Sequence, residues 1–397
     1  MLAYVKGVRP LCSRPLTIGV VAGESSGDHL GAALIRALRA AVPEARFAGI
    51  AGPAMAAEGC ETWAASSELA VMGLFEVLHH LPRLLGLRRR IRSRMLALDP
   101  DVFVGIDAPE FNLNLAPALH GAGIPTVQYV SPQVWAWRRG RARRMARYLD
   151  RVLCLLPFER EVYDQVSLPA VFVGHPLADQ LPLVPDRGAA QAELGLAADA
   201  PVIAVLPGSR IGEVTRLGDS FAGAIAWLAG RRPGLQFVAP MADAATRRLF
   251  EQTLARQAPG VPVRLVDGRA RTALTAASVA LVASGTATLE TLLCKRPMVV
   301  AYRLGALTAL ALRGFRLLKA PHFAQPNLLA GRRVVPELAQ SEVTPERLGR
   351  EIERWLDQPE AVAELQTLFS TIHRQLRQGA SERAAAAILE IARRRPS

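Results

Sequence analysis

The fold is indicated by one stretch of sequence, Leu16-Thr-Ile-Gly-Val-Val-Ala-Gly-Glu-Ser-Ser-Gly-Asp28. Residues 16–21 form a short apolar run that is typical of a buried strand. A polar loop with two glycines follows over 23–28, and the apolar spacing of residues 30–41 then predicts a helix. A strand, a glycine loop and a helix in this order indicate the first unit of a parallel sheet covered by helices.

Similar apolar runs recur along the chain and alternate with helical patterns. We expect further strands at 101–106, 125–130, 151–156 and 170–173, and a second series at 201–206, 235–238, 263–266, 279–282 and 297–300. The proline-rich segment Leu181-Pro-Leu-Val-Pro185 separates the two series. The sequence therefore predicts an α/β protein with parallel-sheet domains at 1–184 and 185–345, a ligand site in the cleft between them, and C-terminal helices over 346–397.

Length and charge narrow the class of protein. The chain has 397 residues, which is too long for one small domain, and its 50% hydrophobic content excludes a disordered chain. Its 48 Lys and Arg exceed its 35 Asp and Glu, giving a net charge of +13 that suits nucleic acid, an anionic membrane or a phosphorylated substrate. We expect no signal peptide and no membrane-spanning helix. The four cysteines are far apart in sequence, which argues against a zinc site or a disulfide framework and favours a reducing compartment.

Polar residues follow two strands of the first series. The loop after residues 16–21 offers candidate binding groups at the start of a helix, where an anion is favoured: Gly23, Glu24, Ser26, Gly27 and Asp28. Asp107 follows the strand at 101–106, where a carboxylate can accept a hydroxyl proton. A plain structural loop and a helix-capping aspartate are the alternative interpretations.

Two motifs of the second series have the composition of a phosphate site. The first is Leu206-Pro-Gly-Ser-Arg210 with Glu213, in which backbone amides and a guanidinium suit a pyrophosphate. The second is Ser284-Gly-Thr-Ala-Thr-Leu-Glu290, whose small polar residues suit a phosphate and whose glutamate suits ribose hydroxyls. The candidate binding residues are Gly208, Ser209, Arg210, Glu213, Ser284, Gly285, Thr286, Thr288 and Glu290. A surface arginine and a buried helix start are the alternatives.

Residues 69–97 have the pattern of a helix that rests on a membrane surface. Apolar residues recur there at helical spacing: Val71, Leu74, Phe75, Leu78, Leu81 and Leu85. Six arginines follow between 83 and 94, and a second arginine cluster follows Trp135 and Trp137. An apolar face beside arginines suits anionic lipid, although a core helix with a solvated face fits the same pattern. No nucleic-acid recognition fold accompanies the clusters.

The ordered motifs resemble those of the lipid-A-disaccharide synthase family, glycosyltransferase family 19. The segments are AGESSGDHLGA, GIDAPEFN, VSPQVWAWR, LPGSRIGEV and SGTATLE, followed by QPNLLAGR, and they extend from Ala22 to beyond residue 331. Each segment alone is a weak signal, whereas their combination in this order is specific. The resemblance implies a GT-B fold, with two Rossmann-like domains and the active site in the cleft between them.

The resemblance also implies an activity. It is the inverting transfer of 2,3-diacylglucosamine from UDP-2,3-diacylglucosamine to 2,3-diacylglucosamine 1-phosphate (lipid X), with no metal and no cofactor. Asp107 matches the general base of the family, Arg210 its essential arginine, and Asn327 and Glu290 two further site residues.

The expected location is the cytoplasm, with peripheral association to the inner face of the inner membrane. The resemblance also implies that the C-terminal helices pack back on the first domain or swap between the subunits of a homodimer. The function of His29, which stands where the family has an aliphatic residue, stays open. The alternatives are another GT-B enzyme acting on UDP-GlcNAc, and a non-catalytic basic protein that binds membrane or nucleic acid.

Overall fold

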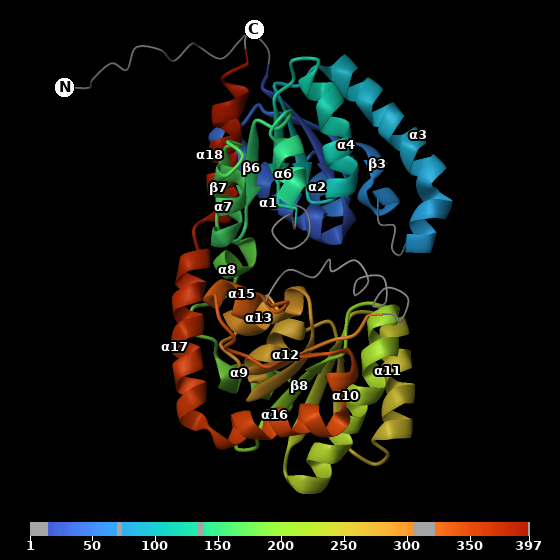
Figure 1. Ribbon diagram of the computed structural model, residues 1–397, viewed down its shortest axis with the longest axis vertical. Coiled ribbons are helices and arrows are strands. Elements are labelled where there is room, and N and C mark those ends of the chain that lie inside the picture. The colour runs from blue at the N-terminus through green and yellow to red at the C-terminus, as the bar shows by residue number, and fades with distance from the viewer. Residues whose placement is uncertain (1–14, 70–73, 133–138, 305–321, 396–397) are drawn as a thin grey trace, which may run out of the picture. The chain divides into compact units, whose positions relative to one another are not determined.

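A computed structural model describes residues 15–69, 74–132, 139–304 and 322–395. The chain divides into two compact units (Figure 1). Unit 1 comprises Met1–Pro176 and Gln378–Ser397, and unit 2 comprises Leu177–Arg377. The units divide between residues 176 and 177, before the expected boundary at residue 184. The short helix α8 (Pro176–Gln180) begins at this division.

Unit 1 is built on a seven-stranded parallel sheet of order β3-β2-β1-β4-β5-β6-β7. The strands are β1 (Thr17–Ala22), β2 (Arg46–Ala51), β3 (Glu61–Ala65), β4 (Val102–Ile106), β5 (Thr126–Tyr129), β6 (Arg151–Cys154) and β7 (Ala170–Phe172). Sheet order reverses between β1 and β4, so that the chain leaves these two neighbouring strands toward opposite edges. This is the switch point at which ligands of open α/β sheets bind.

Helices cover both faces of this sheet. They are α1 (Glu24–Ala41), α2 (Pro53–Ala57), α3 (Leu74–Leu98), α4 (Pro109–His120), α6 (Arg139–Met145), α7 (Arg160–Asp164) and α18 (Ala380–Ala392). On one face, Ile18 and Val20 of β1 share a core with residues of α1 and α18. On the other face, Val21 shares a core with residues of α3 and α4. The C-terminal helix, red in Figure 1, is therefore part of the core of unit 1.

Unit 2 repeats this plan with a six-stranded parallel sheet of order β10-β9-β8-β11-β12-β13. Its strands are β8 (Val202–Leu206), β9 (Gln236–Met241), β10 (Val263–Asp267), β11 (Val279–Ala283), β12 (Met298–Tyr302) and β13 (Glu337–Ala339). Its helices are α9 (Arg187–Glu193), α10 (Ile211–Arg231), α11 (Ala244–Gln257), α12 (Ala270–Ala276), α13 (Thr286–Leu293), α15 (Gln325–Ala330), α16 (Pro345–Asp357) and α17 (Pro359–Leu376). The switch point of this sheet lies between β8 and β11.

The α/β class and the two parallel sheets agree with the expectation from sequence, and one local difference stands out. Residues 24–28 form the first turn of α1 rather than a loop, because Gly23 is its N-cap in extended backbone and Glu24 supplies a negative charge to the first turn. Helix α3 continues through Pro82 as one element. Within the described residues, no helix is both long enough and apolar enough to cross a membrane.

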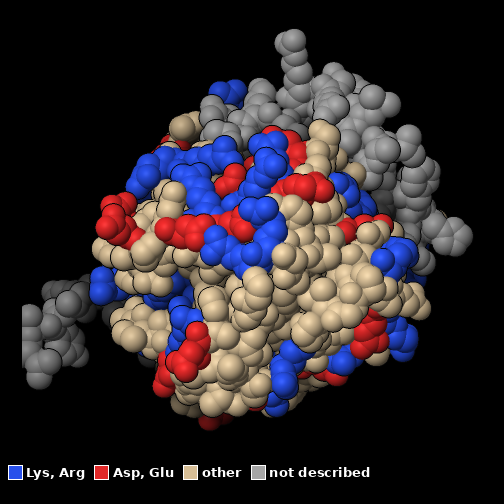
Figure 2. Space-filling model, turned by 90° about the horizontal axis from the view of Figure 1, so that it is seen from below, with Lys and Arg blue, Asp and Glu red and all other residues tan. Residues whose placement is uncertain are grey.

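Ion pairs spread along the surface of unit 2. Arg231 and Arg232 of α10 lie 3.2 and 3.3 Å from Glu353 of α16, and Arg256 of α11 pairs with Asp219. Seen from below, basic and acidic side chains are interspersed on this face (Figure 2). The excess positive charge of the chain therefore does not form a patch of one sign on this face.

Candidate active site

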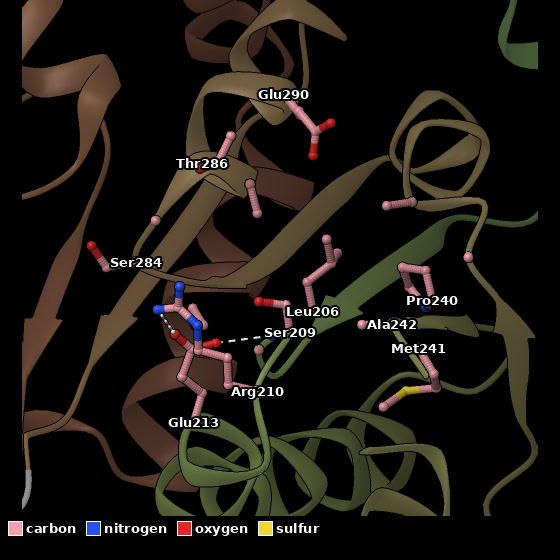
Figure 3. A pocket seen from close by; sticks show the side chains of 16 residues that line it. Leu206, Ser209, Arg210, Glu213, Pro240, Met241, Ala242, Ser284, Thr286 and Glu290 are labelled. Atoms are coloured by element: carbon pink, nitrogen blue, oxygen red, sulfur yellow. Dashed lines mark hydrogen bonds and ion pairs between the residues drawn. The ribbon is translucent and has the colours of Figure 1, made fainter. Parts of the chain in front are cut away.

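A pocket of about 350 Å³ lies at the switch point of the sheet of unit 2 (Figure 3). It is lined by Leu206, Gly208, Ser209, Arg210, Glu213, Pro240, Met241, Ala242, Gly268, Ala270, Ala283, Ser284, Gly285, Thr286, Ala287 and Glu290. These residues come from the carboxyl ends of β8, β9 and β11, from the turns that follow β8, β9, β10 and β11, and from the first turns of α10, α12 and α13. The volume falls within the usual range for small-molecule sites.

The turn between β8 and α10 brings backbone amides and a guanidinium to this pocket. Gly208 has a φ of +136°, and a Cβ there would lie 2.3 Å from the Cβ of Glu213, so only glycine fits. Glu213 Oε2 accepts a hydrogen bond from the N–H of Ser209 at 2.9 Å, which fixes the turn. Arg210 is the N-cap residue of α10, and its half-exposed side chain approaches Glu213 Oε1 at 4.0 Å. The guanidinium is thus held at the pocket and stays accessible.

The turn between β11 and α13 forms the facing wall. Thr286 is the first residue of α13, and Gly285 is its N-cap. Neither N-cap residue, Arg210 or Gly285, caps its helix with a side-chain hydrogen bond. Both N-termini therefore present backbone amides and the positive end of a helix dipole to the pocket. Together with Arg210, they suit a diphosphate.

Glu290 lies one turn into α13 and lines the same pocket (Figure 3). Its carboxylate Oε1 is 3.5 Å from Nε of Arg271, and the guanidinium of Arg271 also donates to Gln180 at 3.1 Å. Arg271 thereby holds the carboxylate in place without burying it. A carboxylate in this position can accept hydrogen bonds from the hydroxyls of a sugar.

Two residues expected at the binding site, Thr288 and Asn327, have side chains that bind nearby backbone. Thr288 is fully buried, and its hydroxyl donates to the carbonyl of Gly285 at 2.8 Å. Asn327 is also fully buried, and its carboxamide Oδ1 accepts hydrogen bonds from Val334 at 2.7 Å and Val335 at 2.9 Å. Neither residue lines the pocket. In this structure their side chains fix the local backbone next to the pocket turns.

The sequence also failed to predict part of the pocket. Pro240, Met241 and Ala242 contribute from the end of β9, and Gly268 and Ala270 from the segment after β10. None of these residues has a side chain with distinctive chemistry. The rule that ligands bind at the carboxyl ends of parallel strands would have indicated them.

The switch point of unit 1 brings together Gly23, Glu24, Gly27 and Asp107. A Cβ added at Gly27 would lie 3.7 Å from the Cβ of Asp107, and one added at Gly23 would meet Ala108. The first turn of α1 therefore lies directly against the residues after β4. Three non-glycine residues here have left-handed backbone, namely Glu24 with φ 55°, Asp107 with φ 52° and Ala108 with φ 39°. Strained backbone of this kind concentrates at functional sites.

Asp107 has the electrostatics of a base. Burial raises the pKa of its carboxyl, the negative charge of Glu24 raises it further, and the N–H of Ala108 lowers it in part. A raised pKa brings a carboxylate closer to the pH at which it can both be ionised and take a proton. Perturbation by burial and by a second carboxylate is characteristic of acid–base sites.

Other residues of the first motif have different surroundings. The carboxylate of Asp28 is buried and accepts hydrogen bonds from the backbone N–H groups of Gly52 at 2.9 Å, Ala54 at 2.8 Å and Met55 at 3.0 Å. Asp28 thus caps α2 and is not available to a substrate. Ser26 is exposed on the first turn of α1. His29 is exposed as well, and its Nδ1 lies 2.8 Å from the carbonyl oxygen of Ser25.

The expected membrane segment is described only in part. Val71, Trp135 and Trp137 lie outside the described residues, and Leu74, Phe75, Leu78 and Leu81 fall within the first turns of α3. Leu85 is half-buried. Further along α3, Leu87, Ile91 and Met95 pack in the core of unit 1, while arginines lie on the outer face of the helix. The C-terminal half of α3 is therefore a core helix with a basic solvated face.

Comparisons with known proteins agree with this arrangement. The family model described as lipid-A-disaccharide synthetase matches residues 18–391. A lipid-A-disaccharide synthase from Serratia proteamaculans is 50% identical over 381 residues, covering 96% of this chain and 99% of that protein. The lipid-A-disaccharide synthase from Sodalis glossinidius is 51% identical over 384 residues, covering 97% of this chain and 100% of its own.

The chain belongs to the lipid-A-disaccharide synthetase family. Solved structures at lower identity share the fold of this family member. The calicheamicin glycosyltransferase CalG4 has a TM-score of 0.58 at 17% identity, covering 96% of this chain and 99% of its own. A UDP-GlcNAc 2-epimerase from Neisseria meningitidis bound to UDP-GlcNAc has a TM-score of 0.64 at 12% identity, covering 94% of this chain and all of its own. The two Rossmann-like units are thus those of a GT-B fold.

Proposed function

We propose that this chain joins two acylated glucosamine units. It transfers 2,3-diacylglucosamine from UDP to the 6-hydroxyl of 2,3-diacylglucosamine 1-phosphate (lipid X), giving a β-1′,6-linked disaccharide 1-phosphate and UDP. Membership of the family makes the chain a UDP-sugar glycosyltransferase of lipid A biosynthesis. The observation that carries the proposal is the pocket of unit 2, which has two helix N-termini and Arg210 where a diphosphate would bind.

The donor is held by unit 2. The diphosphate of UDP binds the amides at the starts of α10 and α13, and Glu290 accepts hydrogen bonds from the ribose hydroxyls. As the bond between C1 and the β-phosphate oxygen breaks, its electron pair leaves with UDP. Arg210 and the helix amides stabilise the negative charge that develops there.

The acceptor is activated by unit 1. Its 6-hydroxyl attacks C1 of the donor and must lose a proton as the new bond forms. Asp107 accepts that proton, and the raised pKa of its carboxyl suits this task. Gly23, Glu24, Ser26 and Gly27 surround the acceptor because they lie on the α1 turn beside Asp107.

Both substrates carry acyl chains, so we further propose that the enzyme works on the cytoplasmic face of the inner membrane. The domain at 1–184 binds the acceptor and docks on anionic lipid through α3, while the domain at 185–345 binds the nucleotide. The helices over 346–397 complete the fold, with α18 packed on unit 1. The excess basic residues bind the anionic lipid surface and the phosphorylated substrates rather than nucleic acid. A homodimer stays open.

The test is to incubate the purified chain with UDP-2,3-diacylglucosamine and lipid X, and to measure UDP release and disaccharide by mass spectrometry. We expect both products in equal amounts, and none when lipid X is left out. Replacing the donor by UDP-GlcNAc distinguishes this activity from that of other UDP-GlcNAc enzymes. Turnover of UDP-GlcNAc alone, without disaccharide from the acylated pair, would contradict the proposal.

A further inference from the structure

Two buried carboxamide side chains lie over Gly105, near the end of β4. Gly105 pairs with Val21 of β1 on one side and with Gln128 of β5 on the other. A Cβ added at Gly105 would lie 2.8 Å from the Cβ of Asn112 and 2.9 Å from Oε1 of Gln128. The glycine therefore leaves room over the sheet for both carboxamides, each from a residue only 1% exposed.

Both carboxamides donate to the same acceptor, the carbonyl oxygen of Asp107. The distances are 2.8 Å from Nδ2 of Asn112 and 3.1 Å from Nε2 of Gln128. Nδ2 of Asn112 also lies 3.3 Å from a carbonyl oxygen of β1. Nε2 of Gln128 lies 3.3 Å from the carbonyl oxygens of Tyr129 and Val130. The two side chains thus bind backbone carbonyls at the carboxyl ends of the three neighbouring strands β1, β4 and β5, around the backbone of Asp107.

Three residues at these strand ends have left-handed backbone. The φ angles are 52° at Asp107, 39° at Ala108 and 74° at Val130. This conformation is unfavourable for residues that carry a Cβ, and most of all for a β-branched valine. It persists only where the surroundings hold it in place. The hydrogen bonds from Asn112 and Gln128 satisfy the half-buried carbonyl of Asp107 in this turn and so help to hold its backbone.

We propose that Gln128 and Asn112 are positioning residues, whose carboxamides hold the carbonyl of Asp107 and so fix the direction of its carboxylate. The inference rests on the proposed function, in which Asp107 takes the proton of the acceptor hydroxyl. A return of this residue to extended backbone would turn the carboxylate away from its present place beside Glu24. A displacement of about 1 Å at a reacting group lowers turnover by about 100-fold.

The test uses substitutions that remove the donors but keep the volume, Gln128→Met and Asn112→Leu. The matched control is Gln191→Met in unit 2. Gln191 is also buried, and among the described residues its Nε2 has no hydrogen-bond partner. Turnover is measured per folded molecule with the acylated substrates, together with the affinity for UDP and the pH profile of kcat/KM.

We expect kcat to fall about 10- to 100-fold in both variants. The KM for the UDP-sugar and the affinity for UDP should stay within about twofold of the wild type, because unit 2 is unchanged. The acidic limb of kcat/KM should move to lower pH, since a carboxylate released into water loses the burial that raises its pKa. Unchanged kcat per folded molecule with an unmoved limb would overturn the proposal.

If the two variants fail to fold, Gln128→Glu replaces them. A buried glutamic acid donates one hydrogen bond when protonated and none when ionised. We expect the activity of this variant, relative to the wild type, to rise as the pH falls. A relative activity that does not depend on pH would contradict a positioning role.

Asp107→Asn, measured alongside, distinguishes a failure of the positioning role from a failure of the base assignment. An inactive Asp107→Asn beside a normal Gln128→Met would refute the positioning role alone. Normal turnover in Asp107→Asn would refute the base itself and the positioning role with it.

Discussion

Gly23 and Ala108 touch across the switch point of unit 1, since a Cβ added at Gly23 would lie 2.6 Å from the Cβ of Ala108. The first residue belongs to the turn after β1 and the second to the turn after β4. Their close approach allows Glu24 to act on the carboxyl of Asp107. The absence of one methyl group thus brings two carboxylates from distant parts of the chain together.

Gly23→Ala should therefore damage the site more than the fold. The added methyl group must push the two turns apart, and such overpacking lowers the free energy of unfolding by about 1–3 kcal/mol. We expect kcat to fall at least about tenfold because Asp107 moves. Thermal unfolding and steady-state kinetics measure the two effects. The control is Gly86→Ala, where nothing lies within 4 Å. That exchange within a helix should stabilise by about 0.5–1 kcal/mol without changing kcat.

Asp107→Asn should abolish turnover and yet stabilise the protein. The raised pKa means that the folded state resists ionisation of Asp107, so this group destabilises the fold increasingly as the pH rises through its titration. Asparagine removes that penalty. We expect a higher Tm at neutral pH, a difference that disappears in acid, and unchanged affinity for UDP by calorimetry. Near-normal turnover would refute the assignment of the base.

Glu24→Gln should shift the pH profile to the acid side. The charge of Glu24 is the second cause, after burial, of the raised pKa of Asp107. Its removal lowers that pKa, so the base is ionised at lower pH and the acidic limb of kcat/KM moves down. Glu58→Gln, which removes a charge paired with Arg36 at the other end of α1, serves as the control and should leave the limb in place. A limb that stays or moves upward in Glu24→Gln contradicts this reading.

Arg210→Ala should lower kcat at least about 100-fold, as the loss of one oxyanion donor does elsewhere. Arg210→Lys should lie between this variant and the wild type, because lysine keeps the charge but lacks the planar fork of arginine. The exposed Arg256 of α11 provides the control, and Arg256→Ala should behave as the wild type. Kinetics of Arg210→Ala within twofold of the wild type would remove the residue from the site.

Replacing Phe75 and Leu78 together with serine should weaken binding to anionic vesicles while leaving the affinity for UDP unchanged. These residues belong to the first turns of α3, next to the arginine cluster that follows. Sedimentation with vesicles at two salt concentrations measures the effect, since the electrostatic part weakens with salt. Val184→Ser, at an 85% exposed position, is the matched control. Equal vesicle binding by the double variant would refute the docking surface.

The strands that the sequence predicted are those with dense apolar runs, such as β1, β4, β8 and β11. It missed β2, which has small residues and a glycine, and the exposed edge strand β3. It also missed β13, which has only three residues. Their pairing comes from neighbouring strands rather than from a strong pattern of their own. The sequence pattern did not predict the start of α1, because the first turn of this helix is polar.

The site was predictable where polar motifs follow strands, as at Arg210 and Glu290, which line one pocket. It was not predictable where a polar side chain binds backbone that is remote in sequence. Asp28 is of this kind, since its partners are backbone N–H groups at the start of α2, more than 20 residues along the chain. The sequence did not indicate a role for Gln128, because this residue lies within β5 and its side chain binds backbone at the end of the neighbouring strand.

The return of the chain to unit 1 has a consequence for its biosynthesis. Residues 378–397 belong to unit 1, where α18 packs against α1 and Arg151 of β6 pairs with Glu390 at 2.7 Å. While the chain grows on the ribosome, unit 1 is begun first but lacks this part of its core until residues 378–397 have been made. Unit 2 has all its residues earlier and can fold first. A chain that stops before residue 378 therefore contains all of unit 2 but leaves the core of unit 1, the unit with Asp107, incomplete.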